Sequence, residues 1–228
     1  MILEERQVTS TNDRAEEWLR SHGTGDLPSF FRADEQTAGK GRRGRFWASP
    51  PGGLYMTAVF EAPDERESLL HPLRCAALIH RSLKALGVRE LKIKWPNDLY
   101  AGRRKLGGLL SRRVVLGGQG VLLVGIGINV RKNMLPSAAV SLEEITGCKK
   151  IAPSELFYSW TNLLQKKLSR AETVEYLNAH LWSRGEYARL KTPGGELTAR
   201  ILKVDEDLSL SVMSEEGKRE RLLLGEIL

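Results

Sequence analysis

A short basic loop is the part of the sequence best suited to chemistry. Residues 39–45 read Gly-Lys-Gly-Arg-Arg-Gly-Arg, so three glycines separate four cations, Lys40, Arg42, Arg43 and Arg45. Glycine lets backbone N–H groups approach a ligand closely, and arginine side chains match the geometry of phosphate oxygens. The segment predicts a phosphate-binding loop. A solvated basic loop and a nucleic-acid patch remain as alternatives.

The same loop contains the pattern Gly-x-Gly-x-x-Gly, but its surroundings argue against a dinucleotide-binding fold. That fingerprint requires a strand before it and a helix after it. Here the polar residues 34–37 precede the loop, and residues 46–51 (Phe-Trp-Ala-Ser-Pro-Pro) follow it. The sequence also lacks the patterns of P-loop NTPases, nucleophile-elbow hydrolases and zinc proteases.

Three further segments combine polar or small residues with predicted strands. Residues 94–98, Lys-Trp-Pro-Asn-Asp, indicate either polar groups aimed at a site or an ordinary Asx turn. Lys105 stands beside two glycines and could set an ammonium against an anion, or be a surface lysine. Gly125 and Gly127 interrupt a β-run ending at Asn129, which indicates close approach by a flat ligand or packing of a helix.

Hydrophobic periodicity predicts the elements that position these segments. Helices are expected at residues 10–22, 72–86 and 153–168, with a further helical stretch to about residue 182. The first helix is predicted to be capped by Ser10 with Asp13, and the second to start at Pro72. Strands are expected at residues 54–60 and 91–94, an extended corner at 95–98, and a hairpin from 108–116 and 121–130. Four or five short strands after residue 182 suggest a small barrel.

Composition sets the protein class. The chain has 228 residues, 41% hydrophobic and 28% charged, with a net charge of +7, which permits an anionic partner without requiring one. Two cysteines exclude a disulfide framework and a multi-cysteine zinc site, and they favour a reducing cytosol. The N-terminus does not read as a signal peptide, and no apolar stretch approaches the length of a membrane helix. The sequence therefore predicts a cytoplasmic protein without membrane association.

The order and spacing of the motifs resemble the biotin–protein ligases, also called holocarboxylase synthetases. The motifs that carry the resemblance are Ser10–Asn12, Gln36–Trp47, Lys94–Asp98, Arg104–Leu110 and Gly125–Asn129. The resemblance covers residues 8–131 and returns at Leu224–Ile227. It implies an α+β fold: a catalytic domain like that of class II aminoacyl-tRNA synthetases at residues 1–182, with a mixed sheet and flanking helices. A C-terminal SH3-like barrel is expected at residues 183–228.

The resemblance also implies two half-reactions. The carboxylate of biotin attacks the α-phosphate of ATP to give biotinyl-5′-AMP, and a lysine of a biotin carboxyl carrier protein then takes the biotin as an amide. ATP with Mg²⁺ is the expected co-substrate, no structural metal is expected, and a homodimer is compatible with the sequence. The barrel is expected to help grip ATP or the carrier. A short form is expected, without the N-terminal DNA-binding domain of some family members and without specific DNA binding. Alternatives are a relative of lipoate–protein ligases or octanoyltransferases, and a non-catalytic nucleic-acid-binding regulator.

The site residues follow from the matching motif positions. The catalytic groups implied are Lys105, Arg42, Arg43 and Asp98. Lys105 would stabilise transition-state charge, Arg42 would hold the adenylate, and Asp98 would orient the acceptor lysine or help hold Mg²⁺. Biotin-binding positions are Ser10, Thr11, Asn12, Gln36, Gly39, Lys40, Gly41, Arg42, Lys105, Gly108, Leu110, Gly125 and Gly127. ATP-binding positions are Arg42, Arg43, Arg45, Trp47, Asn97, Lys105 and Asn129, and the metal ligands are not specified.

Overall fold

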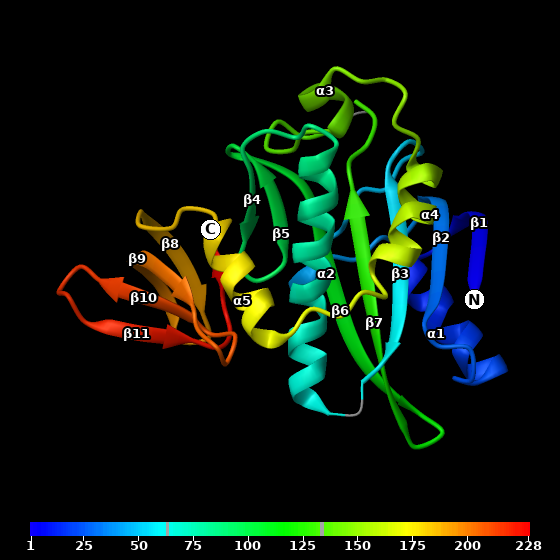
Figure 1. Ribbon diagram of the computed structural model, residues 1–228, viewed down its shortest axis with the longest axis horizontal. Helices are drawn as coiled ribbons and strands as arrows, with labels where there is room; N and C mark the ends of the chain where they lie inside the picture. Colours follow the sequence, from blue (N-terminus) through cyan, green and yellow to red (C-terminus); the bar gives the residue numbers. More distant parts are fainter. Residues whose placement is uncertain (63, 133–134) are drawn as a thin grey trace.

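The computed structural model describes residues 1–62, 64–132 and 135–228, which form two β-sheets with flanking helices (Figure 1). The strands of the first sheet are β1 (Ile2–Val8), β2 (Ser29–Gln36), β3 (Leu54–Glu61), β4 (Leu91–Lys94), β5 (Asp98–Ala101), β6 (Arg104–Leu116) and β7 (Gln119–Ile128). Their order is β1-β2-β3-β7-β6-β5-β4, and the sheet is mixed because β1 pairs parallel with β2 while the other pairs are antiparallel. The helices are α1 (Thr11–His22), α2 (Glu65–Ala85), α3 (Leu142–Thr146), α4 (Pro153–Leu163) and α5 (Arg170–Ala179), with a 3-10 turn η1 at Arg42–Gly44.

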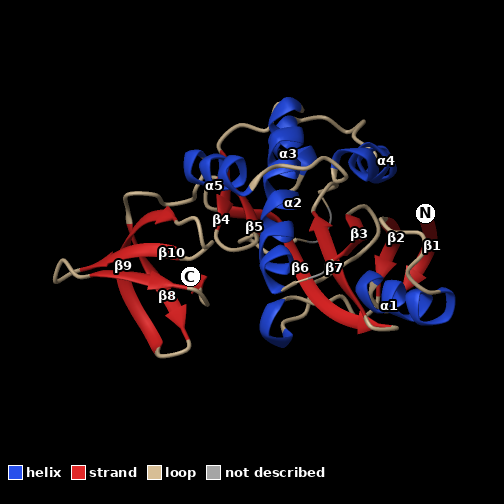
Figure 2. Cartoon of the chain, turned by 60° about the horizontal axis from the view of Figure 1, so that its bottom comes forward, coloured by secondary structure: helices blue, strands red, loops and turns tan. Residues whose placement is uncertain are grey.

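Strand β3 lies in the middle of this sheet and is buried on both faces. Successive side chains of a strand point to opposite faces. Met56 and Ala58 therefore join the large core beneath α2, whereas Val59 packs with Ala15 and Leu19 of α1. Helix α1 lies beside β1 and β2 in both ribbon views (Figures 1 and 2). The α1 face is the one that carries the candidate site.

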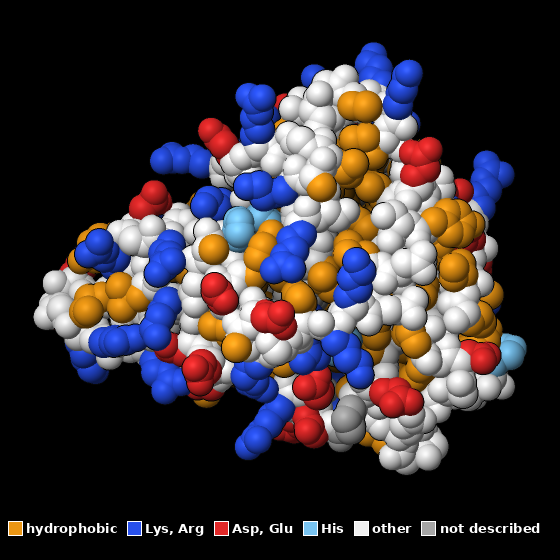
Figure 3. All heavy atoms as spheres, in the orientation of Figure 1, with side chains coloured by type: hydrophobic (Ala, Val, Ile, Leu, Met, Phe, Trp, Pro, Cys, Tyr) orange, Lys and Arg blue, Asp and Glu red, His pale blue; other side chains and the backbone are white. Residues whose placement is uncertain are grey.

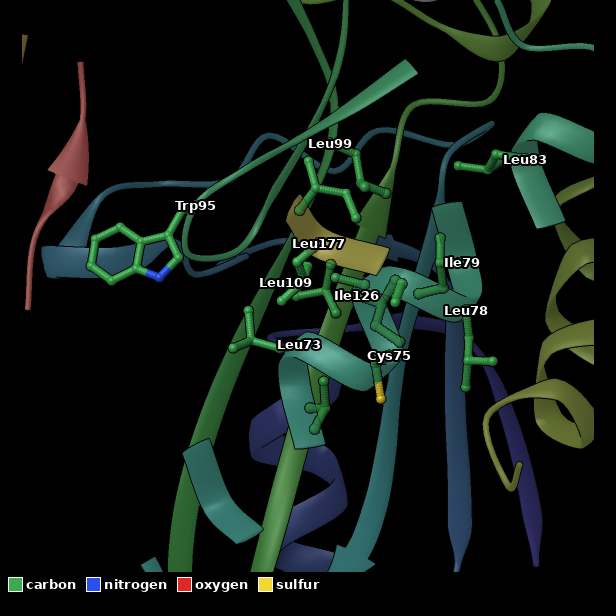
Figure 4. Close-up of a cluster of buried hydrophobic side chains, with 14 of the residues drawn as sticks. Leu73, Cys75, Leu78, Ile79, Leu83, Trp95, Leu99, Leu109, Ile126 and Leu177 are labelled. Atoms are coloured by element: carbon green, nitrogen blue, oxygen red, sulfur yellow. The ribbon is translucent and has the colours of Figure 1, made fainter. Parts of the chain in front are cut away.

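The second sheet lies beside β4 and β5, next to α5 (Figure 1). Its strands are β8 (Tyr187–Thr192), β9 (Gly195–Val204), β10 (Leu210–Ser214), β11 (Arg219–Leu222) and β12 (Glu226–Ile227), all antiparallel, in the order β11-β10-β9-β8-β12. One hydrophobic cluster continues from the first sheet into the second. Trp95 contributes to this junction, because its indole N–H donates to the Leu208 carbonyl at 3.2 Å. Figure 4 shows Trp95 set apart from Leu99 and Leu109, on the side of the C-terminal strand. The division at residues 182 and 183 stays a prediction.

One predicted helix start and one predicted capping box are wrong. Helix α2 begins at Glu65, not at Pro72, because Asp64 caps it by accepting a hydrogen bond from the Glu67 N–H at 2.8 Å. Pro72 lies inside the helix, where its missing N–H removes one intrahelical bond. Ser10 does occupy the N-cap position of α1, but its side chain makes no capping hydrogen bond, so the predicted capping box is absent.

The remaining differences concern element limits and missed strands. Helix α4 ends at Leu163 rather than at residue 168, and β6 begins at Arg104 rather than at residue 108. The segment 95–97 is a tight turn with a cis Trp95–Pro96 bond, not an extended corner, and it joins β4 to β5 as a hairpin. Strands β1, β2 and β5 were not predicted. Within the part of the chain that the structure describes, no helix is both long and apolar enough to cross a membrane.

Candidate active site

The floor of the site is formed by two rows of residues that cross the sheet on its α1 face. Strand pairing aligns Thr57, Gly125 and Leu110 in one row, and Tyr55, Gly127, Gly108 and Asp98 in the next. Two positions in these rows have to be glycine, because a side chain there would collide with Asn12 or Trp47, which pack on this face. A Cβ on Gly125 would sit 2.8 Å from the Asn12 amide, and one on Gly127 would sit 2.7 Å from Nε1 of Trp47. At Gly125 the close neighbour is a side chain of helix α1, as in the helix-packing alternative, and at Gly127 it is Trp47; approach by a ligand stays a prediction.

A cavity of about 360 Å³ lies above these rows. That volume falls within the roughly 300–1,000 Å³ of small-molecule sites. The predicted site residues that line it are Ser10, Thr11, Asn12, Gln36, Lys40, Gly41, Arg42, Arg45, Trp47, Asn97, Asp98, Lys105, Gly108, Leu110, Gly125, Gly127 and Asn129. Lining residues that the sequence did not indicate are Phe46, Ala48, Tyr100, Leu109, Ile126, Leu135, Pro136, Ala138 and Ala139. Gly39 and Arg43 are not among the lining residues, so their ligand contacts stay predictions.

The first turn of α1 gives the cavity a polar, uncharged end. The Thr11 N–H and hydroxyl both point at Oε1 of Gln36, at 2.9 and 3.2 Å. The Gln36 amide in turn donates to Oγ of Ser49 at 2.8 Å. In the described part of the chain, no hydrogen bond engages the hydroxyl of Ser10, which is almost fully buried. These groups suit a neutral ligand moiety with hydrogen-bonding atoms.

The basic loop is tied to elements far away in the sequence. Arg42 donates to Oδ1 of Asn97 at 3.1 Å and to the carbonyl of Gly225 at 3.0 Å. Arg45 forms an ion pair with Glu226 at 2.7 Å. Burial lowers the pKa of Arg42, an effect that neighbouring Glu226 opposes, and a guanidinium remains protonated in such a setting. The C-terminal segment that contains β12 thus holds the loop against the first sheet.

Arg43 and Gly39 of the basic loop do not line the cavity. Arg43 is exposed and has a left-handed backbone (φ 58°) inside η1. Gly39 is buried, and a Cβ there would lie 2.4 Å from the carbonyl oxygen of Trp47 and 2.7 Å from Oγ of Ser49. Gly39 is therefore required for the loop to fold back closely on the segment that follows it.

The charged centre of the cavity is a lysine–aspartate pair. Lys105 Nζ donates to Oδ2 of Asp98 at 2.7 Å and lies 5.1 Å from the centre of the Trp47 ring. A Cβ on Gly108 would be 2.7 Å from Oδ1 of Asp98, so that glycine makes room for the pair. Nε1 of Trp47 is buried without a hydrogen-bond partner among the described residues. A buried donor without a partner is costly, which favours a ligand acceptor for this indole.

Both asparagines that were predicted to bind ATP, Asn97 and Asn129, form hydrogen bonds within the protein. Nδ2 of Asn97 donates to the Leu109 carbonyl, while its oxygen accepts from Arg42. Nδ2 of Asn129 lies 3.3 Å from the Lys105 carbonyl and 3.2 Å from that of Val140. These bonds hold the cavity walls together, and the nucleotide contacts of the two residues stay predictions.

The charge balance of the lining favours an anionic ligand. Its described members include four cations, Lys40, Arg42, Arg45 and Lys105, against a single carboxylate, that of Asp98. On the α2 side of the molecule, shown in Figure 3, basic side chains are interspersed with acidic and apolar ones. Within the described ranges no three histidine, cysteine or acidic side chains are grouped to hold a metal.

The mixed sheet carries a glycine-floored cavity beside a basic loop, and comparison with known proteins gives the family of this chain. The chain belongs to the biotin/lipoate A/B protein ligase family, whose model matches residues 4–133. It is 32% identical over 131 residues to biotin–protein ligase 2 of Arabidopsis thaliana, covering 54% of this chain and 38% of that protein. The chain thus spans well under half the length of this relative.

Solved structures match over nearly the whole chain. The biotin protein ligase of Aquifex aeolicus, in complex with biotin and ATP, has a TM-score of 0.82 at 28% identity, covering 100% of this chain and 97% of that one. The biotin protein ligase of Leishmania major, in complex with biotinyl-5-AMP, has a TM-score of 0.67 at 25% identity, with 98% of each chain covered. The predicted α+β fold is confirmed, and the second antiparallel sheet fits the barrel-like C-terminal domain.

Proposed function

We propose that this chain is an ATP-dependent biotin–protein ligase that activates biotin as biotinyl-5′-AMP and transfers it to a lysine of a biotin carboxyl carrier protein. The observation that carries the proposal is one continuous cavity. It joins the neutral polar end at Ser10, Thr11 and Gln36 to the cationic end at Arg42 and Lys105. Biotin has a neutral ureido ring at one end and a carboxylate at the other, so it matches this polarity. The biotin, ATP and biotinyl-5-AMP named for the related structures support the same assignment.

The first half-reaction joins two anions. A carboxylate oxygen of biotin bonds to the α-phosphorus of ATP, and the bond to the β-phosphate oxygen breaks to release pyrophosphate. Two unit charges 4 Å apart repel by about 4 kcal/mol at an effective dielectric of 20, so cations must offset the repulsion. Lys105 and Arg42 supply fixed positive charge where negative charge develops. Mg²⁺ would supply further charge neutralisation, and Asp98 is the cavity carboxylate that would help hold it.

The second half-reaction forms the amide. The neutral amine of the acceptor lysine attacks the acyl carbon, the bond to the phosphate oxygen breaks, and AMP leaves while the amine loses a proton. Asp98 can orient that amine, because its carboxylate lines the cavity beside Lys105. Enclosure by the basic loop would keep water away from the mixed anhydride.

The partner and the location follow from the same proposal. The partner is a carrier protein that presents a lysine, and no specific DNA sequence is required. The location is the cytoplasm, which suits the two free cysteines, Cys75 and Cys148.

Intact-mass spectrometry tests the function directly. The chain is incubated with MgATP, biotin and a carrier domain, with arms that omit ATP, replace biotin by lipoate, or use a carrier whose acceptor lysine is replaced by arginine. We expect a single biotin adduct on the intact carrier in the complete arm alone. An adduct from lipoate, or no adduct from biotin, would reject the assignment.

A further inference from the structure

We infer that Thr57 is a positioning residue for biotin that acts through Thr11 and Asn12. Its hydrogen bonds leave this end of the cavity able to bind a ligand that donates N–H groups. The inference rests on the proposed function, since it concerns how the same site recognises its neutral ring. Thr57 is not among the lining residues of the cavity and lies directly beneath them, in the row with Gly125.

The position of Thr57 makes its hydroxyl unusual. The residue is fully buried in β3, a strand whose other members from Leu54 to Phe60 are apolar or aromatic. Val59, the next residue of β3 on the same face, packs against α1. A valine would fill nearly the same space as Thr57, and a buried hydroxyl destabilises the fold unless it is hydrogen-bonded. The hydroxyl is therefore best explained by the groups that it contacts.

Those contacts fix the direction of the hydrogen bonds. Oγ1 of Thr57 lies 2.8 Å from Oδ1 of Asn12 and 2.9 Å from Oγ1 of Thr11. The single proton of Thr57 goes to Asn12, because an amide oxygen can only accept. The orientation of that amide is set by its nitrogen, which points at the Leu110 carbonyl at 3.4 Å.

The proton of Thr11 is also used inside the protein. It goes either to the oxygen of Thr57 or to Oε1 of Gln36, which is 3.2 Å away. In both cases Oγ1 of Thr11 keeps a lone pair and has no proton left for a ligand. Thr11 lines the cavity, so it offers the ligand an acceptor. The ureido ring of biotin carries two N–H donors and satisfies this requirement.

Two substitutions distinguish the effect of the Thr57 hydroxyl from the effect of the side chain's shape. Thr57→Val keeps the shape and loses the hydroxyl, whereas Thr57→Ser keeps the hydroxyl and loses a methyl group. The matched control is Thr173→Val, which removes a fully buried hydroxyl that donates to the Ser169 carbonyl in α5. Biotin affinity is measured by calorimetry, and the KM values for biotin and ATP and kcat by pyrophosphate exchange.

We expect Thr57→Val to weaken biotin binding by about tenfold or more, the scale of one lost hydrogen bond that leaves a buried acceptor unpaired. The KM for ATP should stay close to the wild-type value. Thr57→Ser should restore most of the biotin affinity, and Thr173→Val should leave it unchanged. Equal losses in Thr57→Val and Thr57→Ser, or no loss in either, would overturn the inference.

Analogues of biotin provide a second measurement that needs only the unaltered chain. In two cyclic carbamates, an oxygen atom replaces one or the other ureido N–H. We expect at least one of them to bind about tenfold more weakly than biotin, because it sets two acceptors against each other. If both bind as well as biotin, Thr11 does not act as an acceptor and the inference fails. If biotin itself does not bind, the proposed function fails first, so the two failures are distinguishable.

Discussion

Lys105 and Asp98 form an ion pair of 2.7 Å across the pairing of β5 with β6, and both side chains line the cavity. The bulge between Leu99 and Tyr100 shifts the register there, and Gly108 leaves room for the pair. A substrate carboxylate or phosphate that enters the cavity competes with Asp98 for the ammonium. In the proposed reaction, the pair would therefore hold a positive charge where the carboxylate and the phosphate meet.

We expect Lys105→Ala to slow the formation of biotinyl-5′-AMP by about 10²- to 10³-fold, the usual effect of removing one preorganised electrostatic group. The measurement is biotin-dependent pyrophosphate exchange, with circular dichroism as the check on folding. Lys203→Ala is a suitable control, because it breaks a comparable lysine–aspartate pair (Lys203–Asp205, 3.0 Å) in the second sheet. An unchanged exchange rate in Lys105→Ala would remove Lys105 from the chemistry.

Arg42 links the basic loop to two distant elements, and its loss should release the intermediate. Its guanidinium bonds to Asn97 beside β5 and to the carbonyl of Gly225 before β12. In Arg42→Gly we expect biotinyl-5′-AMP to dissociate at least about tenfold faster, because hydrogen bonds to charged groups are among the stronger ones. Escaped intermediate should then biotinylate lysines of a bystander protein, detectable by mass spectrometry.

The control for this release is Arg189→Gly, which breaks an exposed pair with Glu196 in the second sheet. That variant should label the carrier alone. Labelling confined to the carrier in Arg42→Gly as well would contradict a retaining role for Arg42.

Gly127→Ala tests the contact between the cavity floor and Trp47. The added methyl group would lie 2.7 Å from Nε1 and 2.8 Å from Cε2 of the indole, so the ring has to move. We expect the KM for ATP to rise by about tenfold if the ring covers the nucleotide, the equivalent of about 1.4 kcal/mol. Gly25→Ala is the matched control, because a Cβ there meets nothing within 4 Å. Unaltered KM values in Gly127→Ala would show that the position of this ring does not matter for ATP binding.

Much of the site could be predicted because its residues occur in compact local motifs. Gly125 and Gly127 are two residues apart in a strand, so they necessarily share one face. The Lys105–Gly108 segment and the Asn97–Asp98 pair lie at the ends of neighbouring strands, and antiparallel pairing brings such ends together. The order of these motifs along the sequence carried the resemblance, and the resemblance gave the fold.

Other parts carried no local signal. Gly225 and Glu226 reach the basic loop from about 180 positions away, and nothing in their own segment indicates a contact with arginines. A loop also lines the cavity, and its apolar composition has no functional signature; its lining residues are Leu135, Pro136, Ala138 and Ala139. Strand β1 is rich in charge at the edge of the sheet, and this hid its strand pattern. The start of α2 did have a signal, because Asp64 and Glu67 have the three-residue spacing of an N-cap and its partner. Pro72 indicates a later start instead, since proline is common in the first turn of helices.

His80 should make the stability of the fold depend on pH. It is fully buried in α2, where Nε2–H donates to the Leu91 carbonyl at 2.9 Å and Nδ1 accepts from the Tyr176 hydroxyl at 2.8 Å. Burial is the main cause that lowers its pKa from 6.5 to about 4. The unfolded chain therefore takes up a proton near pH 6.5 that the folded chain refuses until about pH 4. Stability linked to His80 is complete above pH 6.5 and is lost as the pH falls through this window.

Urea unfolding at a series of pH values measures this linkage. One proton contributes a slope of up to about 1.4 kcal/mol per pH unit, which the unaltered chain should show between pH 6 and about 4.5 in addition to the effect of its carboxylates. His80→Gln should lose that part of the slope, whereas a substitution of the exposed His22 by glutamine should retain it. Because His80 bonds to the first residue of β4, and β4 leads directly into the Lys94–Asp98 segment, reversible loss of pyrophosphate exchange should accompany the fall in stability. Identical slopes in His80→Gln and the unaltered chain would mean that other groups cause the acid sensitivity.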